Sequence, residues 1–171
     1  DLSICALFKD EAPYLREWVC FHMAQGVEHF FLYDNLSCDR WNLELDDFIC
    51  SGIVEIIPWP HHSCDCKSFE EIRCKAFMHC IHHIKHKTRW CAFLDCNDFL
   101  FSPTCIPVNV FLKKFRKKHH CLCIDRHVFG TSFVDKAPCG LLVRHLLWKC
   151  HSHHECCKVF RYIVQPKFVT G

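Results

Sequence analysis

The sequence has no long hydrophobic run and almost no excess of charge, and each absence excludes a class of protein. Its longest apolar stretches fall well below the roughly 18 residues that a membrane-spanning helix needs. No segment at its start resembles a secretory signal peptide. The formal net charge is only +2, which gives no electrostatic reason to expect binding to nucleic acid or to an anionic membrane surface.

The sequence also lacks internal repeats and low-complexity linkers. Hydrophobic residues make up 50% of its 171 positions, so its composition argues against disorder and its length suits one domain with a real core. We therefore expect residues 1–171 to form a single domain. Because the chain opens directly on a strand-like segment, we also expect it to be a piece of a longer protein.

Cysteine and histidine are unusually abundant, with 17 and 15 residues. An odd number of cysteines leaves at least one unpaired in a monomer. Several lie in apparent strands or helices, where free cysteine behaves as a small buried hydrophobe; these are Cys5, Cys20, Cys74, Cys80, Cys91 and Cys123. The others lie in loops, where they could form disulfides in an oxidising compartment.

Two clusters, HHSCDC (61–66) and HSHHECC (151–157), contain soft metal ligands. Neither has the separated pairs typical of structural zinc, so loop residues or disulfide partners are the favoured interpretation and zinc the weaker one. A cysteine–histidine hydrolase is weaker still, because no Gly-x-nucleophile-x-Gly elbow is present.

Apolar runs alternate with helix-like segments through the first hundred residues. The pattern predicts strands over 2–8, 27–35, 53–59 and 89–95, and helices over 9–26, 39–52 and 68–86. Asp10 is the expected cap of the first helix, and Gly26 and Gly52 the expected ends of the first two. This order predicts an α/β fold with a mostly parallel central sheet flanked by helices and right-handed crossovers.

The pattern weakens after residue 101. It predicts a short helix over 108–118 and further strands over 121–130 and 161–169. The basic run from Lys113 to Lys118 is interpreted as a solvated helix end, since the overall charge is nearly neutral.

Polar side chains follow three of the predicted strands: Lys9 and Asp10, Asp34 and Asn35, and the run from Asp95 to Asp98. The carboxyl ends of parallel strands lie on one edge of a sheet, so these groups can converge on one ligand. Oxygen ligands suit a hard divalent cation, which would offset the charge of a diphosphate. A plain turn at 95–98 is the alternative, and the convergence of three strand ends favours the metal.

Long stretches of the chain resemble glycosyltransferase family 92, in the order in which that family has them. They begin with ICALFKDEAPYLREWVCFHMAQGVEHFFLYDNLSCD, residues 4–39. The later ones are GIVEIIPWP, KAFMHCI, TRWCAFLDCNDFLF, VFGTSF and KVFRYIVQPKFV. The resemblance covers nearly the whole chain.

The resemblance implies a GT-A-type nucleotide-diphospho-sugar transferase fold. It implies transfer of a sugar, often galactose, from a UDP-sugar donor to a glycan acceptor, with Mn²⁺ or Mg²⁺ as cofactor. It also implies the Golgi or secretory-pathway lumen, with membrane attachment only through flanking segments outside this chain.

The resemblance also assigns roles to single residues. The family usually reads DIDEF where this chain has DCNDF at 95–99. Asp95 matches the first acid of the metal- and diphosphate-binding DxD motif. Asn97 replaces the second acid, which should lower metal affinity because a charge is lost, and Asp98 is the residue that would compensate.

Further donor contacts follow from the same resemblance. Asp34 and Asn35 match the strand end that contacts uridine, and Lys9 and Glu11 match positions near the nucleotide. Arg73 stands where the family commonly has Gln. It is interpreted either as a diphosphate ligand or as a surface residue of its helix.

A carboxylate must deprotonate the acceptor hydroxyl in an inverting enzyme of this fold. The candidates are Asp135, just after FGTSF, and Glu155, while Asp125 is less attractive because it lies within an apparent strand. We favour Asp135. A second function stays open, in which the protein is a catalytically weakened member of the fold that binds nucleotide or glycan without turnover. The motivation is Asn97, which replaces an acid of the motif.

Overall fold

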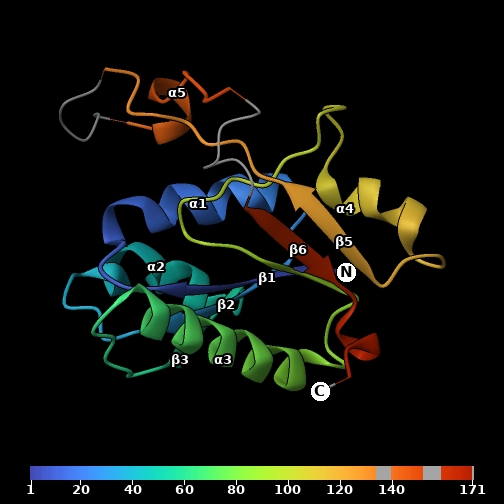
Figure 1. The fold of residues 1–171 in the computed structure, drawn as a ribbon, viewed down its shortest axis with the longest axis horizontal. Coiled ribbons are helices and arrows are strands. Elements are labelled where there is room, and N and C mark those ends of the chain that lie inside the picture. Colours follow the sequence, from blue (N-terminus) through green and yellow to red (C-terminus); the bar gives the residue numbers. More distant parts are fainter. Residues whose placement is uncertain (134–139, 152–158, 171) are drawn as a thin grey trace.

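The computed structural model describes residues 1–133, 140–151 and 159–170, and a six-stranded sheet forms the centre of this part of the chain (Figure 1). Its strands are β1 (Leu2–Phe8), β2 (His29–Asp34), β3 (Val54–Pro58), β4 (Trp90–Phe93), β5 (Cys121–Asp125) and β6 (Phe160–Val164). The order across the sheet is β3-β2-β1-β4-β6-β5. The first four strands of that order pair in parallel, and β6 pairs antiparallel with both β4 and β5.

Helices cover both faces of this sheet. The longer ones are α1 (Ala12–Ala24), α2 (Trp41–Cys50) and α3 (Cys66–Ile84). The shorter ones are α4 (Val108–Leu112), α5 (Leu142–His145) and the 3₁₀ turns η1 (Lys113–Phe115) and η3 (Pro166–Phe168). No helix in the described ranges is both long enough and apolar enough to cross a membrane.

Successive side chains of β1 point to opposite faces of the sheet, and this alternation explains why two cores form. All seven residues of this strand are buried, as expected for a central parallel strand with helices on both faces. Ile4 and Ala6 belong to one core together with residues of α1, α2 and α4. Cys5 and Leu7 belong to the other core, against α3. Successive side chains point to opposite faces, so this one strand contributes to both layers.

The predicted strands and helices are confirmed, and the differences lie at their ends. Asp10 does not cap α1, because Glu11 occupies the N-cap position. Instead Asp10 has a left-handed backbone (φ 56°), and its Oδ1 accepts from the N–H groups of Cys38 at 2.6 Å and Asp39 at 3.3 Å. The turn after β1 therefore holds the loop after β2.

Two predicted strands are shorter than the sequence pattern suggested. β5 stops at Asp125 rather than continuing to residue 130. β6 ends at Val164, and a 3₁₀ turn begins at Pro166, because proline lacks the N–H that a strand ladder needs. The lysines of the basic run after α4 are exposed, as predicted, while Arg116 pairs with Asp1.

The prediction that cysteines within helices and strands are buried is half wrong. Cys5, Cys80 and Cys91 are buried, whereas Cys20, Cys74 and Cys123 are exposed. The exposed three lie on the solvent-facing sides of their elements, which a small apolar side chain tolerates without large cost. Every cysteine in the described ranges is a free thiol.

Candidate functional site

The ends of β2 and β3 are joined by the polar residues predicted to contact a nucleotide. The side chain of Asp34 accepts from the N–H of Ser37 at 3.0 Å, which closes a turn. Asn35 is buried, and its Oδ1 accepts from the N–H of His61 at 3.0 Å. Lys9, at the end of β1, is exposed. These predicted donor residues therefore share the carboxyl edge of the parallel sheet.

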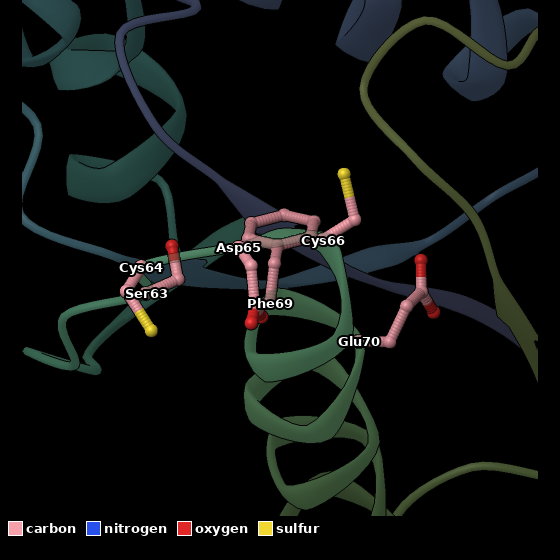
Figure 2. A pocket seen from close by; sticks show the side chains of 6 residues that line it. All are labelled: Ser63, Cys64, Asp65, Cys66, Phe69 and Glu70. Carbon is pink, nitrogen blue, oxygen red and sulfur yellow. The ribbon is translucent and has the colours of Figure 1, made fainter.

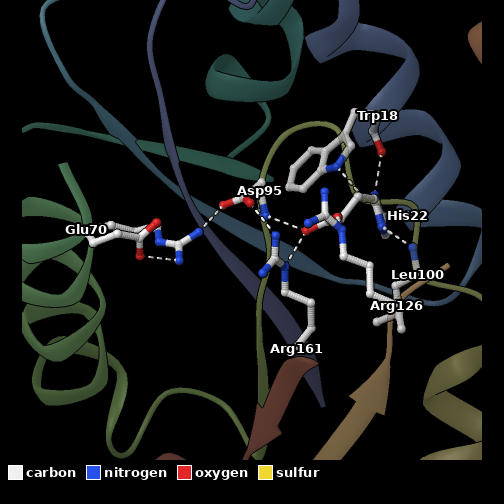
Figure 3. A network of polar contacts seen from close by, with 9 residues as sticks. Trp18, His22, Glu70, Asp95, Leu100, Arg126 and Arg161 are labelled. Carbon is white, nitrogen blue, oxygen red and sulfur yellow. Dashed lines mark hydrogen bonds and ion pairs between the residues drawn. The ribbon is translucent and has the colours of Figure 1, made fainter. Parts of the chain in front are cut away.

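Asp95, just beyond β4, lies between two arginines from distant parts of the chain. Arg73 on α3 donates from Nη1 to Oδ1 at 2.9 Å, and Arg161 on β6 donates from Nη2 to Oδ2 (Figure 3). The side chain of Arg161 is only 10% exposed, whereas that of Asp95 is 31% exposed. Asp95 therefore keeps a solvent-facing side although both of its oxygens carry a guanidinium partner.

Asp98 is more enclosed and closes the turn after β4. Its Oδ2 accepts from the N–H of Asp95 at 3.0 Å and from Nε of Arg161. Its Oδ1 pairs with Nε of Arg126 at 3.1 Å, and the side chain is 10% exposed. Buried carboxylates are stable when paired and hydrogen-bonded in this way. Asn97, between the two acids, is exposed.

The same turn is anchored to α1 by Trp18 and His22. The indole N–H of Trp18 donates to the carbonyl of Asp98 at 2.8 Å, and the N–H of Leu100 donates to Nε2 of His22 at 3.0 Å (Figure 3). Because Nε2 accepts a hydrogen bond, the ring proton is on Nδ1, which donates to the carbonyl of Trp18 at 2.8 Å. Burial lowers the pKa of His22 to about 4, so the ring is neutral near pH 7.

An acidic group borders Asp95 at the start of α1. Burial raises the pKa of Glu11, and the carboxylates of Asp39, Asp95 and Asp10 raise it further. Asp39 holds the helix start, since its Oδ2 accepts from the N–H of Ala12 at 2.7 Å. Glu11 therefore lies within the electrostatic field of Asp95, and its predicted place near the nucleotide stays a prediction.

These contacts do not fit a preassembled metal centre. Asp95 and Asp98 already have partners on all four carboxylate oxygens. Within residues 1–133, 140–151 and 159–170, no group of three His, Cys, Asp or Glu side chains is arranged to hold a metal ion. As metal ligands, Asp95, Asn97 and Asp98 stay predictions.

Sequence reasoning missed Arg126, Arg161, Trp18 and His22 as parts of the site. One signal was available: Arg161 stands in the otherwise apolar run FRYIV, and a charged residue in a buried strand requires a partner. The identity of that partner depends on antiparallel pairing of β6 with β4, which no local pattern encodes.

The predicted catalytic base cannot be placed by the same geometry. Asp135 and Glu155 lie outside the described residues, and so does most of the 151–157 cluster. Asp125 ends β5 and is exposed. The other cysteine–histidine cluster leads into α3, where four of its own residues and two of its neighbours line a pocket of about 420 Å³ (Figure 2). These are Ser63, Cys64, Asp65, Cys66, Phe69 and Glu70.

The sequence pattern of glycosyltransferase family 92 matches residues 1–170. The chain belongs to glycosyltransferase family 92. It is 29% identical over 183 aligned positions to a family 92 protein of Arabidopsis thaliana, covering 100% of this chain and 30% of that protein. It is also 29% identical over 140 positions to a family 92 protein of Oryza sativa, covering 80% of this chain and 23% of that one. The family 92 chain thus spans less than a third of these relatives.

Solved structures of other proteins share the fold of this family 92 chain. Staphylococcus aureus TarS (residues 1–349) aligns with TM-score 0.51 and 14% identity, covering 81% of this chain and 41% of TarS. TarS in complex with UDP also aligns with TM-score 0.51, at 12% identity, covering 78% of this chain and 39% of TarS. A structure described as a glucose-1-phosphate thymidylyltransferase from Bacillus anthracis aligns with TM-score 0.54 and 7% identity, covering 98% and 72% of the two chains. The expected α/β nucleotide-sugar transferase fold is confirmed.

Proposed function

We propose that this family 92 glycosyltransferase moves a hexose, galactose in the first instance, from a UDP-sugar to a hydroxyl of a glycan acceptor. One observation carries the proposal: Asp95 lies at the carboxyl edge of the parallel sheet with Arg73 and Arg161 on its two oxygens. In open α/β sheets this edge is where ligands bind. A fold neighbour solved with UDP supports the choice of nucleotide.

The donor contacts follow from the positions at this edge. Asp34 and Asn35 hold the loops after β2 and β3, where they are proposed to border the uridine. Lys9 and Glu11 flank the turn after β1. The diphosphate is proposed to lie beside Asp95 and Arg73, because guanidinium groups bind phosphate oxygens in a planar, bidentate fashion.

The transfer itself needs a base for the acceptor. In an inverting reaction, the acceptor oxygen forms a bond to C1 of the sugar while the bond from C1 to the diphosphate oxygen breaks. The hydroxyl proton passes to a carboxylate, and Asp135 is the proposed acceptor of that proton. The leaving UDP then carries the negative charge that the donor site must stabilise.

The family resemblance predicts Mn²⁺ or Mg²⁺ in this site, and a metal would offset diphosphate charge there. The paired oxygens of Asp95 and Asp98 do not fit such an ion as the residues stand. The positive charge that meets the diphosphate is therefore assigned to arginine side chains. Placement in the Golgi lumen, attached to the membrane through segments outside this chain, is part of the proposal from family membership.

The first experiment is donor turnover. Purified chain is incubated with UDP-galactose, UDP-glucose, UDP-N-acetylglucosamine and GDP-mannose, and release of free UDP or GDP is measured. We expect hydrolysis of a UDP-sugar, fastest for UDP-galactose, and its loss in Asp95→Ala. Preference for GDP-mannose, or equal turnover by Asp95→Ala, would contradict the assignment.

A second candidate function is a nucleotide- or glycan-binding module without turnover. The exposed Asn97, where the family has an acid, motivates it. The two functions are distinguished by the same assay combined with calorimetry: saturable UDP binding without donor hydrolysis would favour the module.

A further inference from the structure

We propose that the donor diphosphate binds to Arg73, within a cluster of arginines that also includes Arg126 and Arg161, in place of a divalent metal. We further propose that the Glu70 carboxylate occupies the phosphate position until the donor arrives. This inference rests on the proposed function and specifies how the same site recognises its anionic substrate.

The charge balance of the cluster is the first argument. Three guanidinium groups, those of Arg73, Arg126 and Arg161, pair with the two carboxylates of Asp95 and Asp98. Three positive and two negative groups leave one positive charge. That charge is neutralised by Glu70, which pairs with Nη2 of Arg73 (Figure 3). When Glu70 moves away, these five groups carry one net positive charge, which attracts a phosphate and repels a divalent cation.

The burial of the members is the second argument. The side chains of Arg161 and Asp98 are each 10% exposed, so their pairing is part of the packed turn. A metal at Asp98 would have to displace Arg161 and leave its charge buried and unpaired, which is costly. Arg161 and Arg126 therefore hold the two acids in place, and Arg73, whose second partner is the exposed Glu70, is the group that contacts the ligand.

Glu70 is the member that can leave. Its side chain is 54% exposed, and exposed ion pairs contribute little to stability. Glu70 also lines the pocket of about 420 Å³ at the start of α3 (Figure 2), so its carboxylate has open space to move into. Arg73 itself stays in position through Asp95 at 2.9 Å and through the ring of Phe77, 5.9 Å from its guanidinium carbon. A phosphate oxygen can then replace a carboxylate oxygen on the same nitrogen.

Calorimetric titration of UDP into the chain tests the inference, once with EDTA and once with Mn²⁺. We expect saturable binding in EDTA that Mn²⁺ tightens by less than about threefold. Arg73→Gln should weaken binding in EDTA by about tenfold or more, because a charged hydrogen bond is lost. Glu70→Gln should tighten it severalfold by removing the competing carboxylate. Glu71→Gln is the matched control, since this exposed neighbour makes no ion pair in the described residues, and it should leave affinity unchanged.

Two further arms keep the outcomes separate. If Arg73→Gln fails to fold, Arg73→Lys keeps the charge without the bidentate fork and should still weaken binding. Inorganic diphosphate titrated in EDTA tests the arginine cluster without uridine. If inorganic diphosphate binds in a way that depends on Arg73 but UDP does not bind at all, the arginine cluster is a phosphate site and the proposed UDP-sugar donor is wrong. UDP binding that requires Mn²⁺, or stoichiometric binding of Mn²⁺ alone that Asp95→Asn abolishes, would overturn the inference and leave the proposed function standing.

Discussion

The N–H of Leu100 donates a 3.0 Å hydrogen bond to Nε2 of His22, joining residues 78 positions apart (Figure 3). Since Nδ1 of the same ring donates to the carbonyl of Trp18, the imidazole connects α1 to the segment that follows Asp95. The ring can make both bonds only when neutral, because a protonated Nε2 would donate rather than accept.

Because His22 is neutral in the folded protein, we predict that the free energy of unfolding falls at acidic pH. Burial lowers its pKa from about 6.5 to about 4, so the unfolded chain binds the proton first. Stability is therefore retained above pH 6.5 and falls as the pH drops toward 4, by up to about 3 kcal/mol from this group. Urea denaturation at pH 7.5, 6.0 and 5.0 measures the slope. The control is His22→Gln, which should be less stable at pH 7.5 but show a flatter pH dependence; an equal slope in both proteins would refute this origin.

Asp98 is predicted to be a structural residue of the site. Asp98→Ala leaves the buried guanidinium of Arg161 without one partner and frees the N–H of Asp95. We expect unfolding free energy to fall by about 3 kcal/mol or more, as for other broken buried pairs. Asp46→Ala, an exposed acid on α2, should change it by no more than about 0.5 kcal/mol. Similar small effects for both variants in urea denaturation would show that the pair is not stabilising.

Gly26 and Gly52 both have left-handed backbones, with φ of 84° and 74°, but only one is crowded. A Cβ at Gly52 would meet nothing within 4 Å, whereas at Gly26 it would lie 2.1 Å from the side chain of Asn109. Gly52→Ala should therefore cost about 1 kcal/mol from backbone strain, and Gly26→Ala should cost at least about 1 kcal/mol more from overpacking.

A double-mutant cycle separates the two causes at Gly26. In an Asn109→Ala background the clash is removed, so adding Gly26→Ala should cost only about 1 kcal/mol, as at Gly52. Thermal or urea unfolding of the four proteins gives the comparison. If Gly26→Ala lowers the free energy of unfolding equally with and without Asn109→Ala, the clash at Gly26 does not come from the Asn109 side chain.

We expect the reactivity of each cysteine thiol to depend on its burial and not on whether it lies in a helix or a strand. Cys5 and Cys91 are fully buried, and burial raises the pKa of both thiols, so they should resist iodoacetamide in the native protein. Cys20 and Cys74 are exposed on helices and should react. Mass spectrometry of peptides after native labelling, with a second label after unfolding, resolves each site. Early labelling of Cys5 or Cys91 would show that the core opens.

Local sequence was sufficient for the parallel half of the fold. The continuous apolar run of β1 predicts a strand covered on both faces, and the glycines after α1 and α2 mark where those helices end. Strand and helix periodicities are local properties, so they can be recognised without knowing which elements pair. The carboxyl ends of β1, β2 and β4 could likewise be expected to meet, because parallel strands with right-handed crossovers leave little choice.

The electrostatic state of the site was decided by tertiary structure alone. Asp95 could be recognised as a candidate ligand from its position after a buried strand, but its sequence neighbours do not include Arg73, 22 positions away, or Arg161, 66 positions away. Those arginines reach it only because α3 covers one face and β6 pairs antiparallel with β4. Whether a carboxylate is free to bind a metal depends on such long-range partners, because charge interactions act through space and not along the chain.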